Sequence, residues 1–274
     1  MVAWVRAVLS VVWLAAGAPV SAATCNDPGG FEKWLGDIRR EAAAQGLSPA
    51  AINAALSGVT YDPEIIRRDR GQRFFQQSFE QFSAKMVQPY RVQKGAALLN
   101  RYAGLLGQIE RQFGVPGEIL VAIWGLEGDF GAAATGRFPV IQSLATLSYD
   151  CRRSEFFTQH LFDAFRIVQR GDLAPAQMRG AWAGELGQTQ FMASSYYRFA
   201  VDFDGDGRRD LLRSVPDALA STANYLRAYG WQRGQPWTPG TPNFQALKGW
   251  NRSDVYARTI GYFAGRLRGE HATQ

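Results

Sequence analysis

Apolar residues recur at helical spacing along nearly the whole chain, and no long stretch alternates apolar and polar side chains as a half-buried strand does. Two segments begin with a cap residue followed by proline, at Ser48-Pro49 and Asp62-Pro63, which is a typical helix start. We therefore predict a mainly α fold. The other predicted helices cover residues 31–46, 72–87, 92–113, 143–148, 155–169, 216–229 and 255–267.

An aromatic face is expected on one of these helices. Residues Phe74, Phe75, Phe79 and Phe82 have spacings of one, four and three, which place them on one side of a helix over 72–87. We interpret this face as core packing rather than as a sugar-stacking surface.

Residues 1–22 have the composition of a signal peptide, with one arginine, an apolar run and then small residues. Val20 and Ala22 stand at the positions that a signal peptidase reads, so the mature chain is expected to begin near Ala23. Lipid attachment at Cys25 is the alternative. We favour peptidase processing, because the residues directly before Cys25 lack the large aliphatic residue that such sites usually show.

The chain has two cysteines, Cys25 and Cys151. Disulfides persist in exported proteins, so we expect these two residues to pair rather than to remain free thiols. The pair would tie the mature N-terminus to the middle of the fold.

Charge and residue counts exclude several classes of function. The formal net charge of +6 suits an anionic polymer, such as a cell wall, or a membrane surface. Nucleic acid is not an expected partner, since no run of Lys or Arg and no basic aromatic patch is present. With only His160 and His271, a Ser-His-Asp hydrolase or a histidine-rich zinc site lacks its residues. No glycine-rich phosphate loop appears. After these exclusions, the side chains left for catalysis and binding are carboxylates and amides, which favour a polysaccharide as the substrate.

The stretch 122–131 sets one carboxylate, Glu127, among apolar residues. Apolar residues at helical spacing precede it, Pro116 suits the first helical position, and Gly128 suits a C-terminal cap. Glu127 would then leave the last turn of a short buried helix, with Trp124 nearby. Loss of solvation there would raise the pKa of Glu127 toward the range of a general acid. The alternative is an ordinary surface glutamate at a helix end.

Residues 180–197 mix glycine, amides and hydroxyls, which is an unusual composition for a plain core and predicts a binding wall. Five motifs follow one another along the chain: W-G-L-E-G-D-F-G, S-L-A-T-L-S-Y-D-C-R-R, W-A-G-E-L-G-Q-T-Q-F-M-A-S-S-Y, V-D-F-D-G-D-G-R-R-D and A-S-T-A-N-Y-L. Together they resemble the membrane-bound lytic transglycosylase B family of bacteria, over residues 31 to 267.

The resemblance implies a lysozyme-like catalytic core at about 92–232. A helical part at 30–91 and a C-terminal helix at 252–268 would pack on this core, within a mature module of residues 23–274. It also implies a soluble periplasmic member, expected to be a monomer, whose partners are peptidoglycan glycan strands and cell-wall assembly proteins.

The reaction implied by the resemblance is cleavage of the β-1,4 bond between N-acetylmuramic acid and N-acetylglucosamine, with formation of 1,6-anhydromuramic acid. Glu127 would be the sole acid/base. It would protonate the glycosidic oxygen and then take the proton of the muramyl C6 hydroxyl as that oxygen attacks C1. Hydrolases normally need two carboxylates, whereas here the substrate supplies the nucleophile. Asp129 is therefore not needed and is expected to point elsewhere, and the chemistry requires no cofactor.

The same resemblance assigns Gln190, Tyr225 and Ser194 to substrate binding, with Gln190 beside the catalytic acid. A plain core tyrosine is the alternative for Tyr225. Arg152 and Arg153 match a paired arginine that would hold peptide carboxylates with its fork of donors. Solvated charges at a helix start are the alternative for these two residues.

Three positions depart from the family pattern. Gly128 stands where many members have Thr or Ser, Ala181 replaces Ser, and Ala193 replaces Pro. Each change removes a polar contact or a rigid turn, which puts rate and substrate preference in question more than reaction type.

An acidic stretch has the spacing of an EF-hand calcium loop. The predicted calcium ligands are Asp202, Asp204, Asp206, Arg208 through its backbone carbonyl, and Asp217. Arg213 occupies the twelfth position instead of the bidentate Glu, and Asp217 would substitute for it. The alternative for Asp217 is a capping box with Ser214. A bound calcium ion would be structural.

Two other functions stay open. One is a catalytically weak peptidoglycan-binding or scaffold protein that keeps the fold, and the other is a hydrolytic lysozyme. The products released from peptidoglycan would distinguish all three.

Overall fold

The computed structural model describes residues 22–71 and 77–270. The predicted signal peptide, apart from Ala22, lies outside this range, as do Phe74 and Phe75. The described residues form thirteen α-helices, one short 3-10 helix and a two-stranded sheet. The predicted mainly α class is therefore confirmed.

The helices are α1 (Gly30–Ala44), α2 (Pro49–Leu56), α3 (Pro63–Arg70), α4 (Phe79–Met86), α5 (Pro89–Arg101), α6 (Ala103–Phe113), α7 (Gly117–Gly128), α8 (Val140–Tyr149), α9 (Ser154–Arg170), α10 (Ala193–Phe199), α11 (Val215–Ala228), α12 (Pro242–Trp250) and α13 (Asp254–Leu267). The 3-10 helix η1 is Pro175–Gln177. Strands β1 (Phe138–Pro139) and β2 (Arg179–Gly180) pair antiparallel, with Phe138 opposite Gly180.

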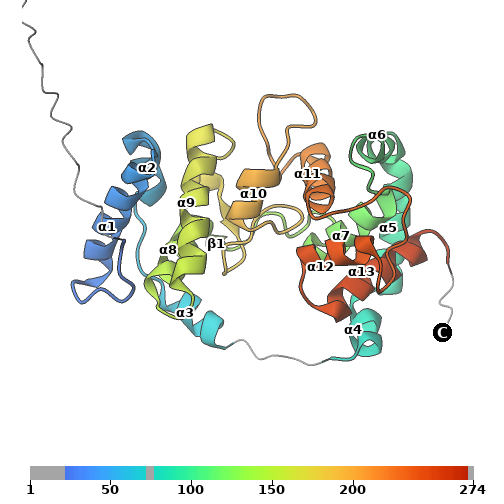
Figure 1. The fold of residues 1–274 in the computed structure, drawn as a ribbon, viewed down its shortest axis with the longest axis horizontal. Coiled ribbons are helices and arrows are strands. Elements are labelled where there is room, and N and C mark those ends of the chain that lie inside the picture. The colour runs from blue at the N-terminus through green and yellow to red at the C-terminus, as the bar shows by residue number, and fades with distance from the viewer. Residues whose placement is uncertain (1–21, 72–76, 271–274) are drawn as a thin grey trace, which may run out of the picture.

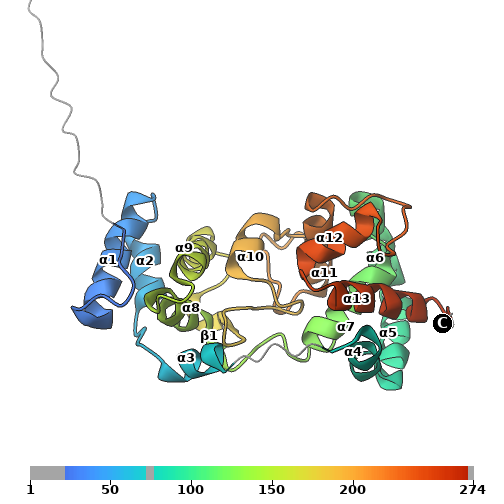
Figure 2. The ribbon, with the colours of Figure 1, turned by 60° about the horizontal axis from the view of Figure 1, so that its bottom comes forward.

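The helices gather in two groups along the long axis of the molecule, as Figures 1 and 2 show. In one group, α2 and α3 pack on α8 and α9, and α1 packs on α2. In the other, α4 to α7 pack with α11 to α13. Helix α10 contacts both α9 and α11 and so joins the groups. The predicted boundaries at 30–91, 92–232 and 252–268 stay a prediction.

Local capping signals are confirmed at two helix starts. The Ser48 side chain accepts a hydrogen bond from the Ala51 amide at 3.2 Å at the start of α2. The Asp62 side chain accepts one from the Glu64 amide at 2.9 Å at the start of α3. Both helices then begin with proline. Proline lacks a backbone N–H, and this costs nothing at the first helical position, because the N–H there has no partner within the helix.

The prediction of one helix over 92–113 is wrong, because the segment breaks into α5 and α6 at Tyr102 (φ −104°, ψ 17°). The break lets both helices pack against α7. A Cβ on Gly95 of α5 would lie 3.5 Å from Val121, and one on Gly117 would lie 3.1 Å from Leu106 of α6. Periodicity missed the break, since each half keeps its own apolar face.

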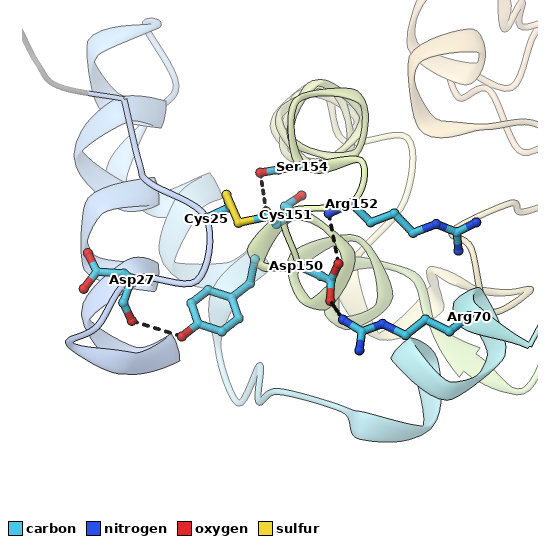
Figure 3. Close-up of a disulfide and its surroundings, with 9 residues drawn as sticks. Cys25, Asp27, Arg70, Asp150, Cys151, Arg152 and Ser154 are labelled. Carbon is cyan, nitrogen blue, oxygen red and sulfur yellow. Dashed lines mark hydrogen bonds and ion pairs between the residues drawn. A yellow bond between two sulfur atoms is a disulfide. The ribbon is translucent and has the colours of Figure 1, made fainter.

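Cys25 and Cys151 form a disulfide, as predicted, and join the segment before α1 to the turn between α8 and α9 (Figure 3). Backbone contacts accompany it, because the Asn26 amide donates to the Tyr149 carbonyl at 2.8 Å. The Asp150 carboxylate in the same turn pairs with Arg70 of α3 at 2.6 Å. The N-terminal segment is therefore held covalently to the turn after α8 and by hydrogen bonds to Tyr149, the last residue of α8.

Within the described residues, no helix combines the length and the apolar character that crossing a membrane requires.

Candidate active site

Helix α7 is almost completely buried and carries Glu127 in its last turn. Pro116 is the N-cap rather than the first helical residue, and the helix continues through Gly128 before Asp129 takes a left-handed φ of 46°. The predicted roles of Pro116 and Gly128 are therefore each displaced by one residue. A glycine is required at 128, because a Cβ there would lie 2.1 Å from the Gln188 carbonyl oxygen. The main chain at Gln188 comes so close to Gly128 that the side chain of Ser or Thr, which many family members have at this position, does not fit here.

The Asp129 carboxylate turns toward α5 rather than toward Glu127, as expected. Its Oδ1 lies 3.6 Å from Arg91 Nε and its Oδ2 lies 3.9 Å from Lys94 Nζ. This carboxylate is neutralised by two cations on a neighbouring helix.

Two aromatic side chains orient the Glu127 carboxylate. Its Oε1 accepts hydrogen bonds from Trp250 Nε1 at 2.8 Å and from the Tyr256 hydroxyl at 2.7 Å. Trp250 ends α12 and Tyr256 lies in the first turn of α13. The sequence analysis missed both residues, because it treated this region only as a supporting terminal helix. A signal was present in the aromatic residues with polar tips on both sides of Ser253, which caps α13.

Glu127, Gln190 and Tyr225 line one cavity of about 420 Å³, so the structure brings three predicted site residues together. The other lining residues are Ala181, Glu185, Phe191, Met192, Ser195, Trp250 and Asn251. Glu185 is a second carboxylate that the sequence analysis did not assign.

Gln190 and Tyr225 are both fixed by hydrogen bonds to backbone carbonyls. Gln190 has a left-handed φ of 53°, and its Nε2 donates to the Gly187 carbonyl at 2.7 Å. The Tyr225 hydroxyl donates to the Gly249 carbonyl at 2.7 Å, and its ring stacks on Tyr229 at 4.4 Å. Tyr225 therefore presents a rigid ring to the cavity rather than a free hydroxyl.

The cavity shifts the pKa of both of its carboxyl groups upward. Burial is the main cause of the raised pKa of Glu127, the hydrogen bonds from Trp250 and Tyr256 lower it, and the charge of Glu185 raises it further. Burial also raises the pKa of Glu185. A general acid at Glu127 is consistent with this environment.

Ser194 lies outside this cavity and lines an adjoining one of about 960 Å³, with Ser195 lining both. The Ser194 amide donates to His160 Nδ1 at 3.2 Å, and burial lowers the pKa of His160 to about 4. His160 is therefore a neutral structural acceptor. Among the described residues, the buried Ser194 hydroxyl has no hydrogen-bond partner.

Arg152 and Arg153 are not brought to the Glu127 cavity, because both pair with Asp69 at the end of α3. Arg152 Nη1 lies 2.7 Å from Asp69 Oδ2, and Arg153 Nη2 pairs with Asp69 Oδ1. Asp69 is only 2% exposed, so these arginines neutralise a buried carboxylate. Their predicted role in holding peptide carboxylates stays a prediction.

The acidic loop brings three predicted ligands together, since carboxylate oxygens of Asp202, Asp204 and Asp217 lie within 4.8 Å of one another. Asp206 does not join them, because its Oδ1 accepts the Arg208 amide at 2.8 Å. The fully buried Asp217 accepts the Phe203 and Asp210 amides, each at 2.8 Å.

Asp217 also takes part in the alternative predicted for it, a cap with Ser214 at the start of α11. Ser214 caps α11 by accepting the Asp217 amide at 3.2 Å, which is half of a capping box. The carboxylate itself folds back onto the loop, and burial is the main cause of its raised pKa.

Comparisons with known proteins show the family and the fold of this chain. The Transglycosylase SLT domain matches residues 30–241. Membrane-bound lytic murein transglycosylase B of Escherichia coli (strain K12) is 38% identical over 171 residues, which cover 59% of this chain and 46% of that protein. The chain therefore spans about half the length of this curated relative.

Two solved structures are similar over most of the chain. SltB3 from Pseudomonas aeruginosa, in complex with NAG-NAM-pentapeptide, has a TM-score of 0.82 and 34% identity over 88% of this chain and 80% of that chain. Slt35 of Escherichia coli, in complex with calcium, has a TM-score of 0.75 and 25% identity over 85% of this chain and 92% of that chain. The predicted lysozyme-like fold is confirmed by these similarities.

Proposed function

Because the chain belongs to the Transglycosylase SLT domain family, we propose that it is a peptidoglycan lytic transglycosylase. It cleaves the β-1,4 bond between N-acetylmuramic acid and N-acetylglucosamine and forms 1,6-anhydromuramic acid. One observation carries the proposal: the Glu127 carboxyl, with a raised pKa, lines a cavity that Gln190 also lines and is held there by two donors.

The geometry suits a single acid/base. Both donors bind Glu127 Oε1, which leaves Oε2 for proton transfer. In the first step Glu127 gives its proton to the glycosidic oxygen as the C1–O bond breaks. In the second step its carboxylate takes the proton of the C6 hydroxyl while that oxygen bonds to C1. The proton returns to Glu127 and no water is consumed.

Substrate contacts follow from the lining of the two cavities. Gln190 and the Tyr225 ring contact sugar beside Glu127, and Ser194 contacts substrate that extends into the adjoining cavity. The side chains of Arg152 and Arg153 are partly exposed at the start of α9, and there they hold peptide carboxylates. Glycan strands are the proposed partner, with cell-wall assembly proteins as further partners and a monomer as the expected state.

Hydrolysis is a second candidate, and one observation favours it. Glu185 brings a second carboxylate into the same cavity, and inverting hydrolases use such a group to activate water.

Product analysis decides between these functions. Purified peptidoglycan is digested with the protein, and the released muropeptides are separated and weighed. We expect products that end in 1,6-anhydromuramic acid, each lighter by one water than its reducing counterpart. Reducing muramic acid ends would contradict the proposal and favour a lysozyme. Binding without release of muropeptides would favour the scaffold function.

We propose export to the periplasm with cleavage before Ala23. The Ala23 backbone nitrogen donates to Glu41 Oε2 at 3.0 Å, so cleavage would convert this hydrogen bond into an ion pair. Cys25 is bonded to Cys151, which leaves no thiol for lipid attachment. The intact mass of the periplasmic protein should correspond to a chain beginning at Ala23. A mass that includes a lipid would contradict this.

A structural calcium ion is a further part of the proposal. Three carboxylates that converge within 4.8 Å fit a hard cation, with Asp202, Asp204 and Asp217 as its ligands. When bound, the ion would neutralise these charges and hold the loop before α11.

We expect Ca²⁺ to raise the Tm relative to EDTA, since a ligand at 100 times its Kd stabilises the folded state by about 2.7 kcal/mol. Asp204→Asn should remove most of this increase. Asp206→Asn should keep it, because Asp206 lies outside the cluster. Thermal unfolding of the three proteins checks this. An unchanged Tm of the wild-type protein would exclude the site, and loss in Asp206→Asn would favour the full EF-hand-like ligand set.

A further inference from the structure

We propose that the adjoining cavity of about 960 Å³ is a second glycan-binding subsite, which holds sugar units of the strand beyond those bound at Glu127. Tyr229 and Phe156 are its stacking residues. The proposal rests on the proposed function for the identity of the ligand, because the strand in the adjoining cavity is the one that the Glu127 cavity cleaves.

The two cavities share a wall. Ser195 of α10 lines both of them. Tyr225 lines the Glu127 cavity and stacks on Tyr229, which lines the adjoining cavity, with ring centroids 4.4 Å apart and an angle of 11° between the rings. Phe199 packs edge-on against both tyrosines, at 5.0 and 6.0 Å. A strand that is longer than the Glu127 cavity therefore meets an aromatic wall that leads into the adjoining cavity.

Tyr229 is held in place although 48% of it is exposed. It follows α11 directly as its C-cap, and its amide donates to the Tyr225 carbonyl at 3.0 Å. A Cβ on Gly249 of α12 would lie 2.4 Å from Cδ1 of the Tyr229 ring, so the main chain of α12 lies close to this ring. An exposed ring that is already fixed suits the apolar face of a sugar, because binding costs it little side-chain freedom.

Phe156 of α9 supplies a second exposed ring. It is 51% exposed, and its ring packs edge-on against Phe157 at 5.0 Å and against His160 at 4.5 Å. The described residues include four large hydrophobic side chains that are exposed, and two of them, Phe156 and Tyr229, line this one cavity. Exposed apolar side chains that gather in one place mark a binding surface, whereas scattered ones need no explanation.

The polar lining suits a sugar. Thr158 and Gln159 of α9 and Ser194 of α10 add hydroxyl and amide groups to the aromatic walls. Ser194 Oγ is buried and, in the part of the chain that the structure describes, lacks a hydrogen-bond partner. Buried polar groups are normally hydrogen-bonded, so a hydroxyl of the ligand would complete this site.

Charge distinguishes the glycan from the peptide stem as the occupant. The acidic and guanidinium side chains that line the cavity are Glu41, Glu155 and Arg198. Glu41 Oε2 already accepts a hydrogen bond from the Ala23 nitrogen at 3.0 Å. The carboxylates of a stem would thus meet no excess of positive charge here. The hydroxyl and acetamido groups of the glycan are neutral, so we assign the cavity to sugar.

The N-terminal segment forms another wall of the adjoining cavity. Ala23, Thr24 and Cys25 line it, and the disulfide from Cys25 to Cys151 ties this wall to the turn before α9 (Figure 3). A covalent bond therefore holds the shape of the cavity before any ligand arrives, as expected of a preformed binding site.

The experiment measures binding to Glu127→Gln, so that the ligand is not cleaved. The ligands are the disaccharide of N-acetylglucosamine and N-acetylmuramic acid and strands of several such units, both without stem peptides. The strands should bind more tightly than the disaccharide. Adding Tyr229→Ala should weaken binding of the strands about three- to tenfold, the loss of one aromatic contact, and leave the disaccharide unchanged.

Two further variants in the same background complete the design. Phe156→Ala, which changes a different wall, should reproduce the loss for the strands only. Tyr90→Ala is the matched control, because Tyr90 of α5 is 52% exposed and lines neither cavity. It should leave the Kd of both ligands unchanged.

Equal affinity of the disaccharide and the strands for Glu127→Gln would overturn the proposal. An equal loss for both ligands in Tyr229→Ala and Phe156→Ala would also overturn it, since the rings would then only support the Glu127 cavity. A loss that appears only when stem peptides remain on the strands would assign the cavity to the peptide instead. If the wild-type protein releases no muropeptides, the proposed function fails, while the dependence of Kd on strand length still tests the subsite.

Discussion

Glu127→Gln is expected to lower kcat for peptidoglycan cleavage by about 10²–10⁴-fold, the usual contribution of a general acid–base residue. The amide keeps the shape of the carboxyl and can still accept the hydrogen bonds from Trp250 and Tyr256. It cannot donate a proton to the glycosidic oxygen or accept one from the C6 hydroxyl. The rate of muropeptide release, measured at saturating substrate, checks this expectation.

Stability measurements distinguish a chemical defect from a folding defect. The folded-state pKa of Glu127 is raised, so its contribution to stability is full at low pH and is lost as the pH rises through the folded-state pKa. Above that pH, Glu127→Gln should be at least as stable as the wild type. Glu118→Gln, in which an exposed pair with Arg268 is removed, should retain full activity. Unchanged turnover in Glu127→Gln would remove Glu127 from the mechanism.

Replacing both cysteines with serine is expected to lower the free energy of unfolding by about 2–5 kcal/mol. Cys25 and Cys151 are 126 residues apart, so the bond restricts a long loop of the unfolded chain. Denaturant unfolding of the variant and of the wild type measures the loss. Neither cysteine lines the Glu127 cavity, although Cys25 lines the adjoining one, so the folded variant should retain the chemical step, measured as kcat.

Denaturant unfolding in the presence of a thiol reductant, which breaks the disulfide, supplies the control for this prediction. The reductant should destabilise the wild-type protein to about the level of the double serine variant and leave the variant itself unchanged. The hydrogen bonds of Asn26 and Tyr149 do not involve sulfur, so we expect the reduced protein and the variant both to keep them. Equal stability of variant and wild type would show that the disulfide does not stabilise the fold.

Interactions within a single helical turn were predictable from the sequence. The caps at Ser48 and Asp62 follow from side chains that contact their own backbone neighbours. The mainly α class follows from apolar residues at helical spacing. Cys25 and Cys151 were also predictable as a pair, because no other cysteine exists. The choice of Glu127 required only its apolar neighbours and the motifs around it.

The contacts around Glu127 were decided by the tertiary structure. Trp250 and Tyr256 lie 123 and 129 residues along the chain from the glutamate that they bind. Glu185 belongs to a motif that the sequence analysis read as an amide-rich wall, and its carboxylate gained meaning only through the cavity that it shares with Glu127.

Backbone features likewise divide into those that the sequence predicts and those that depend on tertiary packing. Gly128 reads as a helix cap in the sequence, but the approach of the Gln188 carbonyl is what excludes a side chain there. The break at Tyr102 likewise follows from packing on α7 and leaves the apolar period intact. Local hydrogen bonds and helical periodicity act over a few residues, so the sequence alone indicated Glu127 and many of the helices, but not the break at Tyr102 or helices α10 and α12. Packing joins residues more than a hundred positions apart, and it alone decided how that acid is held, buried and charged.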